Sequence, residues 1–343
     1  MGASKGRMAV PSLSFNGADV TRRLKDCLKS VTYTDVAEGG SDSLSIRLEN
    51  ASGKWLSKWY PQKGNAIGGS VRLKRWGKDG KDKKLEFGTF TLDDARFGFG
   101  PMELELSGTS APAASAFSTR ERNKTWKKVT VEEIAIRICE RYGMTLSYAG
   151  GAHKVKALEQ SENDGAFLKK LCEDYGLSMK IYMDKVVIYD LCELEEADAV
   201  RSFAITDFPQ GDLSITDGLY GTYTGARVSY KPEDGEDEIS VFVGTKEEGD
   251  KKRVLKVNEA CDSEAEARRK GAAKVNEANR KAVTLSGSIF PDAKVCAGAC
   301  IELKKDFGRL AGKYFVDKST WTIDASGGTK QKIDAHKVQE RVA

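Results

Sequence analysis

The 343 residues of this chain are enough for two or three ordinary domains, and 40% of them are apolar, which suffices to build hydrophobic cores. The 55 basic and 51 acidic residues nearly cancel, whereas a dedicated duplex-DNA-binding protein usually carries a clear basic excess. No apolar run approaches the roughly 20 residues that a membrane-spanning helix needs, and the first residues lack the long apolar segment of a secretory signal.

Residues 1–112 are strand-rich, and we expect them to fold as a first β-barrel-like domain. Apolar and polar residues alternate in five runs, separated by Gly, Asn or Asp, at 30–36, 43–48, 71–76, 85–92 and 102–106. The hairpin between the third and fourth runs is strongly charged. Its basic side chains, a tentative subunit contact, are Arg72, Lys74, Arg75, Lys78, Lys81, Lys83 and Lys84. Such a charge run is more often a solvated loop tip, with partner docking or nucleic-acid contact as the alternatives.

Residues 113–200 change from strand periodicity to helix periodicity after a linker of small residues, and they predict a small α+β domain. Thr130 and Glu133 form a capping-box pattern, in which each side chain satisfies a free backbone N–H at a helix start. Gly143 is placed to end this helix, because glycine accepts the left-handed conformation that follows a last helical turn. A strand is then expected at 145–148.

A second helix of this domain opens at 161–164 and ends at Gly176, before a strand at 178–190. The ends of the two helices resemble each other, since ICERYGMTL at 138–146 matches LCEDYGLSM at 171–179. Two copies are too few for a solenoid, so a duplication and a convergent helix-stop-strand pattern both explain the match.

Residues 201–343 return to strand periodicity and predict a second β-barrel-like domain with one packed helix. The helix begins at a capping-box pattern, Ser263 with Glu266, and extends to about residue 281. Its narrow stripe of small apolar residues would let it lie close to a sheet; the stripe is Ala265, Ala272 and Val275. The expected strands are 219–230, 239–244, 253–257, 283–290, 299–303, 312–323 and 330–338.

No arrangement of residues in the sequence indicates catalysis. His153 and His336 are isolated and belong to no known catalytic motif. Cys296 and Cys300 are the nearest cysteine pair, but a zinc site would need a second pair or nearby histidines. The seven scattered cysteines fit a reducing cytoplasm. We therefore assign no catalytic, cofactor-binding or metal-binding residue, expect no cofactor, and predict that the chain is not an enzyme.

Several segments follow one another in the order known from one protein family. They are VTRRLK at 20–25, VTYTD at 31–35, LEFGTFTLDD at 85–94, STRERNKTW at 118–126, EQSENDGAFL at 159–168 and GKYFV at 312–316. Together they resemble the phage late control protein D family, the central hub of contractile-tail baseplates. The two segments of the α+β domain are the most specific part of this resemblance, which covers nearly the whole chain.

The resemblance implies a homotrimer in which each subunit carries two similar barrel domains flanking the α+β insert. Three subunits then form a ring that adapts the sixfold tail tube to the threefold central spike. It implies contacts with the tail tube protein, the spike protein, other inner baseplate proteins and a tape-measure protein, and a channel through which DNA passes without specific binding. It also implies assembly in the bacterial host cytoplasm and a final place in the baseplate of a phage or tail-like bacteriocin. Related fused spike proteins add an oligosaccharide-binding fold and a β-helix, so here we expect the spike to be a separate polypeptide.

Two other functions remain open at this point. The chain could be a tail-tip module that binds cell-wall glycan, or one that hydrolyses peptidoglycan. A glycan-binding module would need an exposed aromatic shelf, and a hydrolase would need a pair of acidic residues that the sequence does not reveal. If the chain is a hub, the charged hairpin at 72–84 is expected to contact a neighbouring tube or baseplate subunit, and the insert to face outward.

Overall fold

The computed structural model describes residues 6–76, 81–110, 116–182, 184–230, 239–244, 253–261, 263–326 and 328–342. The N-terminal part is built almost wholly from strands, with one short helix and one 3₁₀ turn. Its elements are β1 (Met8–Phe15), β2 (Ala18–Asp19), α1 (Thr21–Leu24), β3 (Leu28–Val36), β4 (Ser43–Glu49), η1 (Lys54–Leu56), β5 (Ala66–Lys74), β6 (Lys83–Phe99) and β7 (Met102–Thr109). Every run predicted here is a strand, and β6 continues past its predicted end at 92.

The C-terminal part supplies a second set of strands. They are β13 (Arg201–Phe203), β14 (Leu213–Asp217), β18 (Val283–Ile289), β19 (Cys300–Leu303), β20 (Gly312–Asp324) and β21 (Thr329–Lys337), with 3₁₀ turns η2 (Ile205–Asp207) and η4 (Lys305–Leu310). Four of them match predicted runs closely. β13 and β14 lie outside every run that the alternation predicted, because their alternating segments are short.

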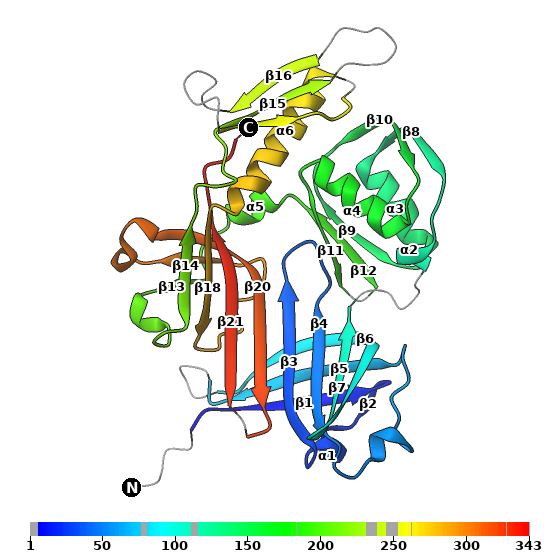
Figure 1. The fold of residues 1–343 in the computed structure, drawn as a ribbon, viewed down its shortest axis with the longest axis vertical. Coiled ribbons are helices and arrows are strands. Elements are labelled where there is room, and N and C mark those ends of the chain that lie inside the picture. The colour runs from blue at the N-terminus through cyan, green and yellow to red at the C-terminus, as the bar shows by residue number, and fades with distance from the viewer. Residues whose placement is uncertain are drawn as a thin grey trace.

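Both sets of strands join into one sheet of 13 strands within the described residues (Figure 1). Its order is β14-β18-β21-β20-β3-β4-β7-β6-β5-β1-β2, while β13 joins through β19, which pairs with β20. The joint between the two parts is the antiparallel pair β20 and β3, in which Lys318 lies opposite Val36 and Asp324 opposite Ser30. Backbone hydrogen bonds between β20 and β3 therefore join the N-terminal and C-terminal parts into one sheet.

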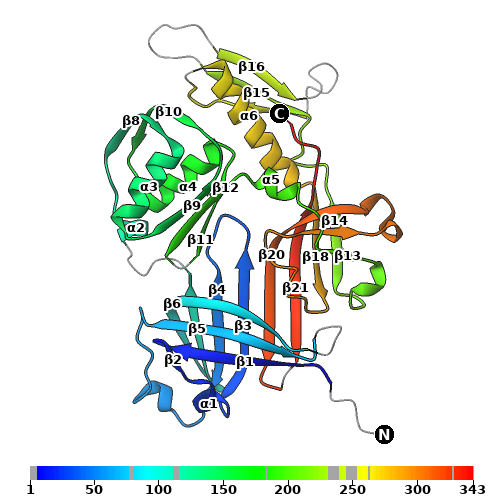
Figure 2. The same ribbon diagram turned by 180° about the vertical axis from the view of Figure 1, so that it is seen from behind.

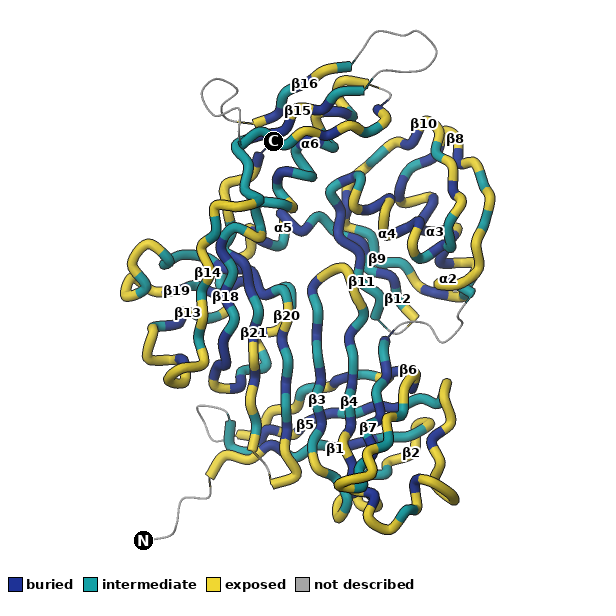
Figure 3. Tube along the Cα trace, in the orientation of Figure 1, coloured by how far each residue is buried: buried dark blue, intermediate teal, exposed yellow. Residues whose placement is uncertain are grey.

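Burial alternates along the strands of this sheet, as the tube in Figure 3 shows. In the N-terminal part, β1 and β5 cross over β3 and β4 (Figures 1 and 2), and the apolar side chains between them form a core. That core includes Tyr33, Trp55, Phe87, Phe90 and Trp321. A separate core in the C-terminal part contains Phe203, Leu285, Ile301, Tyr314 and Ile333. The predicted mainly β class is confirmed.

The two parts of the sheet repeat each other in strand order and register. The series β3-β4-β7-β6-β5 of the first part corresponds to β14-β18-β21-β20-β19 of the second. The pairs β6–β7 and β20–β21 each contain a bulge, between Leu92 and Asp94 and between Val316 and Lys318. With these bulges superposed, VTYTD at 31–35 in β3 corresponds to LSITD at 213–217 in β14. The chain thus contains two copies of one β unit.

The insert between these units is the predicted α+β domain. Its elements are α2 (Ala116–Thr119), β8 (Lys124–Thr130), α3 (Val131–Arg141), β9 (Thr145–Ala149), β10 (Lys154–Gln160), α4 (Asp164–Asp174), β11 (Ser178–Tyr182), β12 (Lys185–Tyr189) and α5 (Leu191–Glu195). The capping box of Thr130 and Glu133 is present, and Gly143 has a φ of 63°. The second helix begins within the predicted 161–164, with Asn163 as its cap, since the Asn163 side chain accepts from the Ala166 N–H. The single strand predicted at 178–190 is a hairpin of two.

A further small unit lies within the last part of the chain. It consists of β15 (Gly225–Tyr230), β16 (Ile239–Gly244), β17 (Val254–Val257) and α6 (Glu264–Arg280), which form their own hydrophobic core. The buried stripe of α6 is Ala267, Gly271 and Val275, whereas Ala265 is exposed. Of the predicted stripe, Val275 is buried and Ala272 packs against this core. Only Ala265 was wrong, because a run rich in alanine leaves the helix face ambiguous.

The last strand-rich block thus contributes to more than one core, and the domain boundaries at 112 and 200 stay a prediction. Among the described helices, none has both the length and the apolar character that crossing a membrane requires.

Candidate functional site

One face of the sheet is lined by hydroxyl side chains where the two β units meet. Because successive side chains of a strand point to opposite faces, the core residues alternate with this second, partly exposed set. The register aligns its members in rows across β20, β3, β4 and β7. One row is Thr320, Thr34, Ser43 and Thr109, and the next is Thr322, Thr32, Ser45 and Ser107. We call these rows, with the charged residues beside them, the polar face.

Several charged residues of the polar face form ion pairs with one another. Lys318 Nζ lies 2.7 Å from Asp334 Oδ2 across β20 and β21, and Arg47 Nε lies 3.7 Å from Glu105 Oε2 across β4 and β7. Lys29 forms an ion pair with Glu103. Exposed pairs of this kind contribute little to stability. They balance part of the charge of the polar face, which also carries Lys330 and Lys332 of β21, opposite Thr322 and Thr320.

The charged hairpin predicted as a contact is the turn between β5 and β6. Leu73 pairs with Lys83 at its last described rung, and Lys78 lies outside the described residues. Of the other basic side chains, Lys74 and Arg75 are partly buried, and four are exposed: Arg72, Lys81, Lys83 and Lys84. Lys84 forms an ion pair with Glu86. Arg75 Nε donates to the Gly6 carbonyl over 2.9 Å, so this side chain is held within the chain.

The base of this hairpin packs on the C-terminal β unit. Trp76 Nε1 donates to the Pro291 carbonyl over 2.7 Å, and its ring centroid lies 6.0 Å from that of Phe290. The Arg7 guanidinium covers both rings, at 5.9 Å and 5.2 Å. The hairpin is thus anchored at its base, while Lys81, Lys83 and Lys84 are exposed to solvent. Sequence reasoning missed Trp76, since nothing local signals a contact over more than 200 residues.

His336 lies at the junction of α5, β20 and β21 and is buried. Its Nδ1 lies 2.7 Å from Asp317 Oδ1, and its Nε2 lies 3.1 Å from Glu195 Oε1. Arg280 of α6 donates to the same Glu195 oxygen over 2.9 Å. Burial opposes a charge on this imidazole, but the bonds to both carboxylates raise the pKa of His336 to about 9. The side chain acts as a cationic joint between the sheet and the helices above it.

A second buried polar cluster surrounds Asp164 in the insert. Asp164 is fully buried, and its carboxylate accepts from Arg122 Nε at 2.9 Å, Tyr142 Oη at 2.7 Å and Gln160 Nε2 at 2.7 Å. Arg141 completes the set. Burial by itself raises the pKa of Asp164, and these hydrogen bonds outweigh it and lower the pKa. Since every partner is an internal donor, the cluster fastens α4 to the rest of the insert.

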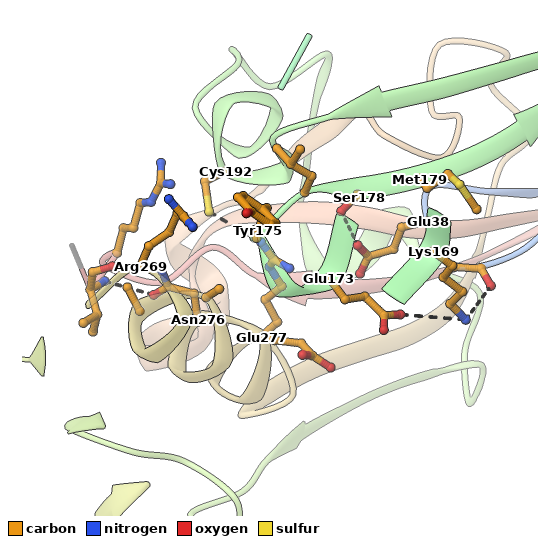
Figure 4. A pocket seen from close by; sticks show the side chains of 18 residues that line it. Glu38, Lys169, Glu173, Tyr175, Ser178, Met179, Cys192, Arg269, Asn276 and Glu277 are labelled. Atoms are coloured by element: carbon orange, nitrogen blue, oxygen red, sulfur yellow. Dashed lines mark hydrogen bonds and ion pairs between the residues drawn. The ribbon is translucent and has the colours of Figure 1, made fainter. Parts of the chain in front are cut away.

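A cavity of about 560 Å³ separates the insert from α6 (Figure 4). Arg269, Asn276 and Glu277 line it from α6, while Lys169 and Tyr175 line it from the insert. Its charges are of both signs and partly engaged with one another. Among the described residues, no group of three or more His, Cys, Asp or Glu side chains could hold a metal ion.

Comparisons with known proteins agree with the resemblance found in the sequence. No protein-family model matches the chain. It is 25% identical over 237 residues to the probable baseplate hub protein of Escherichia phage 186, a match that covers 64% of this chain and 55% of that protein. The corresponding protein of Escherichia phage P2 is 26% identical over 225 residues, with the same coverage. The chain thus matches little more than half the length of these curated relatives.

The fold is also that of a solved tail protein. A tail protein from Neisseria meningitidis superposes with a TM-score of 0.70 at 13% identity, covering 97% of both chains. At this identity the likeness concerns the fold. Together with the relatives above, it confirms the resemblance to baseplate hub proteins and the mainly β class with an α+β insert.

Proposed function

We propose that this chain is the structural hub of a contractile-tail baseplate, in a phage or a tail-like particle. In this role, three copies close into a ring that adapts the sixfold tail tube to the threefold spike. The relatives named baseplate hub proteins support the general role. The internal repeat supports the ring, because three chains with two equivalent β units each present six similar edges to a sixfold neighbour.

The observation that carries this proposal is the polar face, whose hydroxyl rows cross the joint between the two β units. A ring of these units would place one sheet face toward the hydrophobic cores of the β units and the other toward a central channel. Hydroxyl rows and exposed ion pairs suit a water-filled channel. The nearly balanced charge of the whole chain suits passage of DNA without tight binding, since binding to its phosphates relies on an excess of basic side chains.

A measurement of mass in solution tests the ring. We expect light scattering of the purified chain, alone or mixed with its spike protein, to give a mass of three subunits or a three-to-three complex. The tail tube protein should bind one end of that complex. A chain that remains a monomer in the presence of both proteins would contradict the proposal.

The exposed lysines of the hairpin are proposed to contact the tube or an adjacent baseplate subunit. Replacing Lys81, Lys83 and Lys84 with Glu reverses the charge at this surface and should abolish stacking on tube rings, while the ring itself still forms. A control variant carries the same Lys-to-Glu change at Lys127 and Lys156, which are exposed lysines of the insert. Equal stacking by both variants, seen by electron microscopy, would remove the hairpin from the interface.

One feature favours glycan binding as a second candidate function. A mostly apolar hollow of about 290 Å³ in the first β unit is rimmed by Trp59, which is 37% exposed, and Tyr60, which is 54% exposed. Aromatic faces of this kind can bind sugar rings. Retention of the chain on purified peptidoglycan, lost on replacing both residues with Ala, would support this function. Identical retention of the double variant would exclude this site.

A further inference from the structure

The sheet has an open edge at each end of the series that carries the polar face. Within the described part of the chain, β14 pairs only with β18, so its outer edge has no partner strand. At the other end, β6 pairs with β5 as far as Thr91, and residues 94–99 pair with β7 alone. β14 and β6 lie at the two opposite ends of this series of strands (Figure 1). Such edges expose unpaired N–H and C=O groups, which favours pairing with another chain.

The joint inside the chain shows how such edges can be closed. Residues 318–324 of β20, which follow its bulge, pair with residues 30–36 of β3. Backbone hydrogen bonds at the two ends of this joint run from Ala37 N to Asp317 O, 2.8 Å, and from Ala325 N to Lys29 O, 2.9 Å. The side chains of this joint are packed, since Val31 and Ile323 are 0% exposed and Trp321 is 2% exposed.

The internal repeat gives each open edge a counterpart in this joint. Residues 94–99 of β6 follow its bulge as residues 318–323 of β20 follow theirs, so Phe97 corresponds to Trp321 and Phe99 to Ile323. In the same way β14 corresponds to β3, with Ile215 at the position of Tyr33. One copy of the chain therefore offers a β20-like edge and a β3-like edge, both without partners.

We infer that β6 of one copy pairs antiparallel with β14 of the next, in the register that β20 and β3 use within the chain. This inference rests on the proposed ring and specifies its subunit contact. Copying the in-chain register fixes each opposing pair: Ala95 with Asp217, Arg96 with Thr216, Phe97 with Ile215, Gly98 with Ser214 and Phe99 with Leu213.

This register keeps both faces of the sheet consistent across the contact. Arg96 and Thr216 continue the polar face, as Thr320 and Thr34 do at the joint inside the chain. Phe97, Phe99 and their partners join the core side. A shift by one residue would bring apolar side chains onto the polar face, so the alternation specifies the register.

Residues at the open edges are exposed where the corresponding residues of the β20–β3 joint are buried, which indicates that the open edges bind a further strand. The joint residues are buried, whereas Phe99 is 72% exposed at the position that corresponds to the buried Ile323. Leu219, which follows β14 and corresponds to the buried Ala37, is also 72% exposed. Large apolar side chains this open beside unpaired strand edges mark a contact surface. A second copy fits it because it brings the complementary edge.

The contact is of the head-to-tail kind, since β6 and β14 are different surfaces of the chain. Such contacts form rings when the rotation between copies closes. If each contact between copies repeats the geometry of the β20–β3 joint, a closed ring leaves neither edge open. Closure is thereby also a protection against uncontrolled edge pairing.

Engineered disulfides test the register directly. Arg96 and Thr216 correspond to Thr320 and Thr34, which alternate with the hydrogen-bonded pairs, and Cα atoms at such positions lie about 4.5 Å apart. That separation suits a disulfide. The variant Arg96→Cys with Thr216→Cys, with exposed Cys296 replaced by Ser, should yield covalent trimers on a non-reducing gel after mild oxidation.

Two control variants make the result specific. Thr34→Cys with Thr320→Cys places the same pair at the joint inside the chain, and it should consume both thiols without a change in mass. Arg96→Cys with Ser214→Cys shifts the contact by two residues and should give far fewer cross-links.

The possible outcomes separate this inference from the proposed function. A trimer by light scattering whose 96–216 pair stays reduced, while the 34–320 pair oxidises, overturns the contact and leaves the ring. Cross-linking that is equal for the shifted pair overturns the register. A chain that stays monomeric even with its spike and tube proteins overturns both the contact and the ring.

Discussion

His336 should hold its proton well above neutral pH, and this charge should stabilise the junction between the sheet and the helices. The imidazole is 3% exposed and lies between Asp317 and Glu195, which raise its pKa to about 9. An unfolded chain would show the ordinary histidine pKa, about 6.5. The difference corresponds to about 3 kcal/mol of folding free energy, at 1.36 kcal/mol for each pH unit.

The direction of the pH dependence follows from the raised pKa. Below about pH 6.5 both the folded and the unfolded chain carry the proton, so the full stabilisation is present. As the pH rises toward 9, the unfolded chain loses its proton first, and the stabilisation falls until the folded imidazole also titrates. The junction should therefore weaken on the alkaline side and gain nothing from further acidification through this group.

The presence of only two histidines makes the assay simple. Nuclear magnetic resonance of the chain with nitrogen-labelled histidine should show one imidazole that titrates near 9. The other, His153, should titrate below its ordinary range, because burial and Arg269 lower its pKa. A His153→Gln variant assigns the two signals.

Stability supplies the second readout. Urea unfolding of the wild type and of His336→Gln, at about pH 6 and about pH 10, should show an extra loss of about 3 kcal/mol for the wild type. Two imidazoles that both titrate at or below 6.5, or parallel stability curves for the two proteins, would refute the reasoning.

The other predictions concern the edges and cores of the β units and the insert. Phe99→Asp should weaken trimer formation, since burying one such ring is worth about 1.5–3 kcal/mol, whereas Ile136→Asp, an exposed residue of the insert, should not. Asp164→Ala should destabilise the insert by about 3–5 kcal/mol in thermal unfolding, because two arginines lose their buried partner; an unchanged melting curve would contradict this role. Gly271→Leu should destabilise the small unit by about 1–3 kcal/mol, because a Cβ there already lies 2.8 Å from Val228 Cγ2, while Ala265→Leu on the exposed face serves as the control.

Local features of the fold could be predicted from the sequence because their causes lie within a few residues. The Thr130 capping box joins positions three apart, and Gly143 ends the helix through its own backbone conformation. The strand at 239–244 follows from alternation alone. The family resemblance also came from short segments. None of these depends on which distant residues lie nearby.

Features that depend on distant partners were decided by the tertiary structure. The continuation of β6 to Phe99 and the pairing of β20 with β3 need a register between strands far apart in the chain. The partners of Trp76 and His336 come from distant segments, so no local pattern indicates them. The hydrophobic face of α6 was ambiguous because several alanines could form it, and only the position of Val228 in the adjacent strand selects Gly271.

The internal repeat is recognised only when the sequence and the tertiary structure are combined. VTYTD and LSITD were legible in the sequence, but five residues with two identities are common by chance. Only the shared strand order and the two bulges establish that β3 and β14 occupy equivalent places. The sequence by itself determined the strands, the helix ends and the family resemblance, because these depend on short-range order. The tertiary structure decided which edges are paired and which are open, because hydrogen bonds between strands join residues that the sequence does not bring together.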